Sequence, residues 1–198
     1  KIKPTNMVGT TAELEDFLQG YSIEVMPRTA EKIERFQDIL PKGTRVYIAH
    51  IEGSSIEDMV KTAARLSDEG YAVMPHFPAR IIKDKATLEN WIDMYQGEAG
   101  VKQALLLAGS VKTPHGVFDS SMQLLETGLF DAKEFDHLHV AGHPEGNKDI
   151  DPDGSHNNID RALSWKQQFS ELTDAKMALA TQFAFEADPI IEWVTALK

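Results

Sequence analysis

Side chains that can carry out acid–base chemistry recur where short apolar runs of the sequence end. The residues at these positions are Glu24, His50, Glu52, His76, Arg80, Ser110, His143, Glu145 and Gln182. A single polar residue in such a position is most often exposed to solvent or hydrogen-bonded to a neighbouring residue, without a functional role. Because they follow six successive runs, they indicate as a group a site built at the ends of strands.

Glu24 is the sharpest single candidate among them. It lies in "SIEVMP", between Ile23 and Val25. Burial among apolar neighbours would raise the pKa of this carboxyl group and make it a general acid near neutral pH. The alternative, left open by the sequence, is an inward carboxylate that is simply hydrogen-bonded within the fold.

Three other kinds of site are disfavoured. The histidines, among them His50, His76, His143 and His156, have neither an i, i+4 spacing nor a fixed short pattern, so no metal site is predicted. No GxSxG elbow of a serine hydrolase occurs. The segment "AGSVKTPHG" has the wrong spacing for a phosphate-binding glycine loop and is not followed directly by a helical pattern.

The elements that must position these side chains alternate between strand-like and helical patterns. The strand-like runs cover residues 21–28, 45–53, 71–80, 103–110, 137–145 and 176–186. The segment between the second and third runs keeps helical spacing, with Ser54 or Ser55 able to cap its start and Gly70 able to end it. Apolar strands separated by amphipathic helices predict an α/β fold with a parallel sheet covered by helices.

A (β/α)8 TIM-type barrel is favoured over a doubly wound sheet, and residues 1–198 are expected to form one domain. Only six βα units are visible, and "DPIIEWVTALK" falls inside the expected sixth helix. We therefore expect the encoded polypeptide to continue for on the order of 60 to 100 residues, or the closing strands to be supplied otherwise. Residues 146–160 are predicted to form a long polar loop that is functional or mobile.

Composition limits the partners and the compartment. With 20 Lys and Arg against 31 Asp and Glu, the net charge is -11, so nucleic acid and anionic membranes are not expected as main partners. The chain has no cysteine, no 18-residue apolar run and no signal-peptide core in its first 17 residues. A cytoplasmic protein is expected, and a homo-oligomer is left open.

Five motifs occur in the order and at the places found in one enzyme family. They are "YSIEVMPR", "MPHFPAR", "LLLAGS", "HVAGHPEGN" and "ATQFAFE", and the similarity spans residues 21–193. In these motifs the chain resembles the methylenetetrahydrofolate reductases. The resemblance implies a (β/α)8 barrel that binds FAD, takes hydride from NADH or NADPH and passes it to 5,10-methylenetetrahydrofolate, giving 5-methyltetrahydrofolate.

The resemblance also assigns roles to single residues. Glu24 matches the acid that promotes opening of the one-carbon bridge of the folate, and Gln182 matches the glutamine that hydrogen-bonds the pterin. The residues that match positions lining FAD are His76, Ala141, His143 and Asn147, and Lys166 matches a lysine that meets the cofactor's pyrophosphate.

The chain departs from the family after its fourth run. Where the family has Arg-Gly-Asp, this sequence has Ala108, Gly109 and Ser110, which by position are expected beside the cofactor, with Ser110 also a catalytic candidate. His143 and Asn147 replace a tyrosine and a histidine, and His50 and His143 are candidates to compensate for the lost arginine and carboxylate. A non-catalytic flavin- or folate-binding module and a metal-dependent (β/α)8 hydrolase are the alternatives.

Overall fold

The computed structural model describes residues 10–197, so the first nine residues, on which part of the signal-peptide argument rests, lie outside the described residues. Each of the six apolar runs forms a strand, and all neighbouring strands are parallel. The strands are β1 (Ser22–Val25), β2 (Arg45–Ile48), β3 (Ala72–Pro78), β4 (Gln103–Leu107), β5 (His137–Gly142) and β6 (Lys176–Thr181). Their order in the sheet is their order in the chain. The predicted parallel α/β architecture is confirmed.

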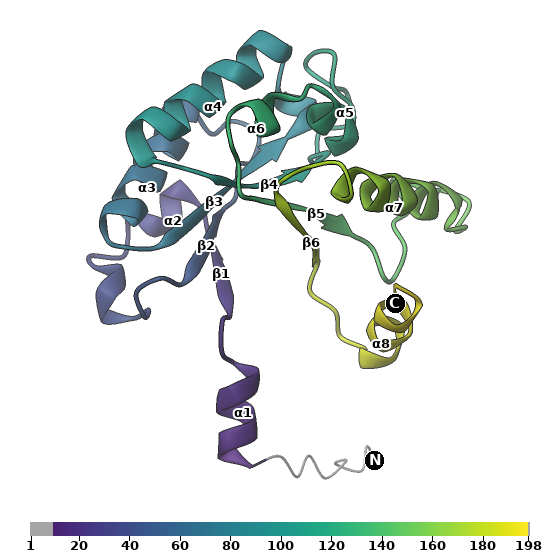
Figure 1. Cartoon of the computed structure of the whole chain (residues 1–198), viewed down its shortest axis with the longest axis horizontal. Coiled ribbons are helices and arrows are strands. Elements are labelled where there is room, and N and C mark those ends of the chain that lie inside the picture. The colour runs from purple at the N-terminus through teal and green to yellow at the C-terminus, as the bar shows by residue number, and fades with distance from the viewer. Residues whose placement is uncertain (1–9, 198) are drawn as a thin grey trace.

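Helices form an arc outside the curled sheet (Figure 1). The helices are α1 (Thr11–Phe17), α2 (Pro27–Ala30), α3 (Ile56–Asp68), α4 (Lys85–Ala99), α5 (Ser121–Glu126), α6 (Leu129–Ala132), α7 (Asn157–Ser170) and α8 (Ala187–Ala196), with short 3-10 helices at Phe36–Asp38 and Ala79–Ile81. The arc is open between β1 and β6, where α1 and α8 are seen (Figure 1).

The sheet is therefore a curled half-barrel. Within residues 10–197, β1 pairs only with β2 and β6 only with β5, so no closure between the two outer strands is seen. The structure is compatible with part of a TIM-like barrel, and the full eight-stranded barrel remains a prediction.

The two faces of the sheet differ because alternate residues of a strand point to opposite sides. The outer face carries apolar side chains that pack under the helices. They include Val25, Val46, Ile48, Val73, Phe77, Ala104, Leu106, Leu138 and Val140. The residues between them face the inside of the half-barrel, and several of these are polar.

Helix α3 shows why the sequence pattern was informative. Ser55 caps its start by accepting a hydrogen bond from the backbone N–H of Asp58, and Gly70 follows its end with a φ of 92°. Met59, Val60, Ala63 and Leu66 are buried against the sheet. The predicted cap, helix end and buried face are all confirmed.

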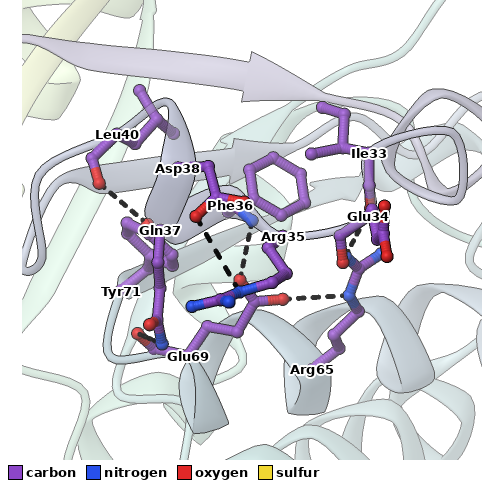
Figure 2. Close-up of polar contacts among 10 residues, drawn as sticks. All are labelled: Ile33, Glu34, Arg35, Phe36, Gln37, Asp38, Leu40, Arg65, Glu69 and Tyr71. Atoms are coloured by element: carbon purple, nitrogen blue, oxygen red, sulfur yellow. Dashed lines mark hydrogen bonds and ion pairs between the residues drawn. The ribbon is translucent and has the colours of Figure 1, made fainter.

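Arg65 of α3 holds the connection between β1 and β2 in place (Figure 2). Its guanidinium group donates to the carbonyl oxygens of Ala30, Ile33 and Glu34, and its Nε donates to Glu69 Oε1 at 3.0 Å. The other carboxylate oxygen of Glu69 accepts the backbone N–H of Phe36 at 2.8 Å. One planar cation thus donates hydrogen bonds to the carbonyl oxygens of three residues at the end of α2 and just after it.

We expect Arg65→Lys to lower the free energy of unfolding by about 1 to 3 kcal/mol, because an ammonium group cannot place its N–H donors at all the positions that the planar guanidinium group reaches. Urea unfolding measures the loss, and hydrogen exchange should show faster exchange in residues 31–40. The matched control is Arg161→Lys, at an exposed arginine of α7. Equal stability of the two variants would contradict the role of Arg65.

Candidate functional site

The inner face of the half-barrel carries a cluster of polar side chains from strands that are not neighbours. Tyr47 Oη of β2 lies 2.6 Å from His139 Nδ1 of β5, and Arg45 Nε of β2 donates to Gln103 Oε1 of β4 at 3.0 Å. Glu24 Oε2 of β1 lies 3.2 Å from His76 Nε2 of β3. Contacts that skip strands are possible only because the sheet curls, so that its inner side chains converge.

The expectation that burial raises the pKa of Glu24 is wrong for this structure. The side chain is 58% exposed, because β1 is an outer strand of an open sheet. The short contact with His76 is the main cause that lowers the pKa of Glu24, the charge of His76 acts in the same direction, and burial opposes it only in part. Glu24 is therefore ionised at neutral pH unless a neighbour supplies a proton.

Sequence reasoning missed the second half of this cluster, namely Arg45, Tyr47, Gln103 and His139. The tyrosine ring lies between two imidazoles, with centroids 6.3 Å from His76 and 5.9 Å from His139. Burial raises the pKa of Tyr47. The available signal was the alternation of polar residues within the strands, which places Arg45 and Tyr47 on the same face.

His139 is a neutral imidazole held inside the half-barrel. Burial, followed by the positive charges of Arg45 and His137, lowers its pKa to about 4. The side chain contacts Tyr47 through Nδ1, and the tautomer decides which of the two donates.

This low pKa makes stability depend on pH. The unfolded state takes up a proton on His139 near pH 6.5 and the folded state only near pH 4, so stability is fully present above pH 6.5 and is lost as the pH falls towards 4. We expect this loss to reach at most about 3.5 kcal/mol, since the pKa differs by about 2.5 units and each unit is worth about 1.4 kcal/mol. In His139→Gln, urea unfolding between these pH values should show a correspondingly flatter dependence. Identical slopes in both proteins would contradict a buried, neutral His139.

The segment after β4 is shaped by Arg80. The guanidinium of Arg80 donates to the carbonyl of Val111 and lies 2.9 Å from Asp119 Oδ1, while its backbone N–H donates to the carbonyl of Ala108. Gly116 passes so close to the Lys83 carbonyl that no side chain would fit between them. Arg80, a candidate site residue, therefore positions the segment that carries Ala108, Gly109 and Ser110.

In this segment Ala108 and Gly109 are half-buried and Ser110 is exposed at the rim. Gly109 has a φ of 94°, a backbone conformation that favours glycine. Another rim contact joins Glu52 and His115, with 3.4 Å between Oε1 and Nε2. Glu52, after β2, and Ser110, after β4, thus lie at the same edge of the sheet.

His50 follows β2 and lies near enough to His76 for the charge of His76 to act on it. Its ring stacks on Trp91 of α4 with centroids 4.9 Å apart, and its Nε2 contacts the carbonyl of Ser54 at 3.2 Å. Burial lowers its pKa, and its Nδ1 is buried without a hydrogen-bond partner among residues 10–197.

The end of β5 brings three predicted cofactor residues together. Ala141, His143 and Lys166 line a small cavity of about 40 Å³, with Trp193 of α8 on its other side. Lys166 is buried, and its Nζ donates to the carbonyl of Ala141 at 2.8 Å. Burial lowers the pKa of Lys166, and burial together with the charge of Lys166 lowers that of His143. The cavity is too small for a flavin or an adenine ring.

The loop that follows is organised by a buried carboxylate. Asp151 is 2% exposed and accepts the backbone N–H groups of Asn158 and Ile159, the latter at 3.1 Å. Asn147 is turned into its own loop, where its Oδ1 accepts the backbone N–H of Asp149. The predicted polar loop at 146–160 is too long by four residues, because α7 begins at Asn157.

Gln182 lies directly after β6 and is exposed. The aromatic residues that follow, Phe183 and Phe185, form an edge-to-face pair with centroids 4.8 Å apart and are also exposed. A larger cavity, of about 270 Å³, lies between β5, β6, α7 and Leu197. Its lining residues Val140 and Leu179 belong to the helix-covered side, so this cavity is separate from the inner polar cluster.

Comparison with models of known protein families finds no match for this sequence. Within residues 10–197, no helix is long and apolar enough to cross a membrane. In the same part of the chain, no three His, Asp or Glu side chains gather in a way that could hold a metal ion.

Proposed function

We propose that this protein is a flavin-dependent oxidoreductase that interconverts 5,10-methylenetetrahydrofolate and 5-methyltetrahydrofolate with NADH or NADPH. The observation that supports it is the convergence of the motif residues on one sheet edge and inner face. Glu24 and His76 are in contact, and Ala108, Ala141 and Gln182 follow or end strands of the same parallel sheet.

The residues at this edge fit a flavin in two respects. Ala108, Gly109 and Ala141 carry little or no side chain, which lets a flat ring approach the backbone closely. The buried Nδ1 of His50 lacks a partner among the described residues, as expected of a group that completes its hydrogen bonds with a ligand. Lys166 fits a role at the pyrophosphate of FAD less well, because its ammonium group already donates a hydrogen bond to the carbonyl of Ala141 in β5.

In this proposal bound FAD, once reduced by NADH or NADPH, would supply the hydride, and the protein supplies the proton. Hydride can add to the one-carbon bridge only after its bond to N10 breaks, with the electron pair left on N10 and an iminium formed at N5. Glu24 delivers the proton that N10 needs. Gln182 would hold the pterin through its side-chain amide, and the half-barrel would exclude water from one side of the rings.

Absorbance of the purified protein after incubation with FAD and removal of free cofactor tests the proposal. We expect retained flavin colour that is bleached by NADH or NADPH and restored by 5,10-methylenetetrahydrofolate. A protein that stays colourless would rule out the proposal that this chain binds FAD.

A coloured protein whose flavin is not reoxidised by the folate would favour the second candidate, a non-catalytic flavin-binding module. The loss of the family's arginine and carboxylate at Ala108 and Ser110 is the observation in its favour. The metal-dependent hydrolase has no support from a cluster of ligands in the described part of the chain.

A further inference from the structure

His76 presents a buried nitrogen to a single neighbour. Its side chain is 11% exposed, and its Nε2 has no hydrogen-bond partner among residues 10–197. The nearest carboxylate is Glu24, whose Oε2 lies 3.2 Å from Nε2, although the angle is not that of a hydrogen bond. Burying an imidazole nitrogen without a hydrogen-bond partner lowers the stability of the folded state. An apolar side chain at this position would pack without that loss.

The surroundings of the pair contain no second group that could take the place of Glu24. His76 pairs in register with Leu105 of β4, which is apolar. The titratable and charged neighbours on the other elements are Tyr47 and Arg45 of β2, His50 after β2 and His139 of β5. Tyr47 and His139 are hydrogen-bonded to each other, and Arg45 donates to Gln103. The ring of His50 stacks on Trp91, with its Nε2 at the carbonyl of Ser54.

From this geometry we propose that His76 is a positioning residue that stores the proton which Glu24 delivers to the substrate. The inference rests on the proposed function and deepens it. Because Nε2 is buried and faces only Glu24, a proton on Nε2 can pass directly only to that carboxylate. The lowered pKa of Glu24 supports the pairing, since a carboxylate ionised at neutral pH needs a neighbouring donor.

The proton balance of the step is simple. As the bond between N10 and the one-carbon bridge breaks, N10 keeps the electron pair and takes the proton from Glu24. That proton comes from His76 Nε2, which first passes it to the ionised Glu24 Oε2, so over the whole step the imidazolium becomes a neutral imidazole and Glu24 returns to a carboxylate. Between turnovers His76 regains a proton from solvent.

His76→Gln tests this assignment, because glutamine can donate a hydrogen bond to Glu24 but cannot store a proton. We expect the rate at which 5,10-methylenetetrahydrofolate reoxidises the reduced flavin to fall about 10- to 100-fold at neutral pH. The rate should recover as the pH is lowered towards the ordinary pKa of a glutamate, since Glu24 must then be protonated from solvent. The control is His137→Gln, whose histidine lies at the start of β5 beside Asp136. It should keep the wild-type pH profile.

A second measurement does not need folate turnover. The pKa of Glu24, followed by carbon-13 NMR of labelled glutamate, should rise in His76→Gln and stay unchanged in His137→Gln. Folate turnover with an unaltered pH profile in His76→Gln, or an unaltered pKa of Glu24, would overturn this inference and leave the proposed function standing. A wild-type protein without any folate turnover would overturn both.

Discussion

In the proposed reductase, replacing Glu24 with glutamine should abolish most of the folate half-reaction and leave the nicotinamide half-reaction intact. The amide keeps the shape of the side chain and its place beside His76, but it has no proton to give to N10. General acid catalysis contributes a factor on the order of 100 to 10,000, and we expect a loss within that range. Reduction of the flavin by NADH or NADPH needs no acid at the folate and should proceed at the wild-type rate.

Stopped-flow absorbance of the flavin separates the two half-reactions. Equal losses in both would mean that Glu24 holds the cofactor or the fold rather than supplying a proton. Near-normal folate reduction would move the acid role to another side chain, with Glu52 at the same rim as the next candidate. As a control, Glu126→Gln changes an exposed carboxylate at the end of α5 and should leave both half-reactions unchanged.

The second large effect is expected in the core, at Phe77. This residue points to the outer face of β3, is fully buried, and packs against Tyr95, Phe130 and Phe135 with ring centroids between 5.3 and 6.5 Å away. Phe77→Ala should lower the free energy of unfolding by about 3 to 5 kcal/mol, because the helices above it cannot close the cavity.

Urea unfolding followed by circular dichroism measures this loss. Phe17→Ala is the matched control, since Phe17 is 83% exposed on α1 and should change stability by less than about 0.5 kcal/mol. A loss of under about 1 kcal/mol in Phe77→Ala would show that the aromatic cluster repacks freely, contrary to the packing seen here.

The elements of this fold could be predicted because their signals are local. Apolar runs and helical spacing mark the strands and α3, and Ser55 and Gly70 mark the ends of that helix. The start of α7 was missed because its principal cap is Asp151, six residues before Asn157 and outside any local capping pattern.

The inner cluster could be predicted only in part, because it depends on the curl of the sheet. The contact between Glu24 and His76 joins residues 52 positions apart on strands that are not neighbours, and the one between Tyr47 and His139 spans 92. The pKa of Glu24 was predicted in the wrong direction for the same reason. Apolar neighbours in sequence point to the other face of a strand and do not bury the residue between them.

Asp151 has a consequence for how this edge of the molecule meets anions. The aligned peptide dipoles of a helix place about half a positive charge at its first turn, which in many proteins attracts a phosphate group. In α7 that partial charge already faces a carboxylate belonging to the chain, which takes the N–H groups of Asn158 and Ile159. A phosphate approaching the first turn of α7 would be repelled by the negative charge of Asp151. The backbone N–H groups of Asn158 and Ile159 would not be free to bind it. Any anionic ligand at this edge must therefore be balanced by cationic side chains rather than by the helix dipole.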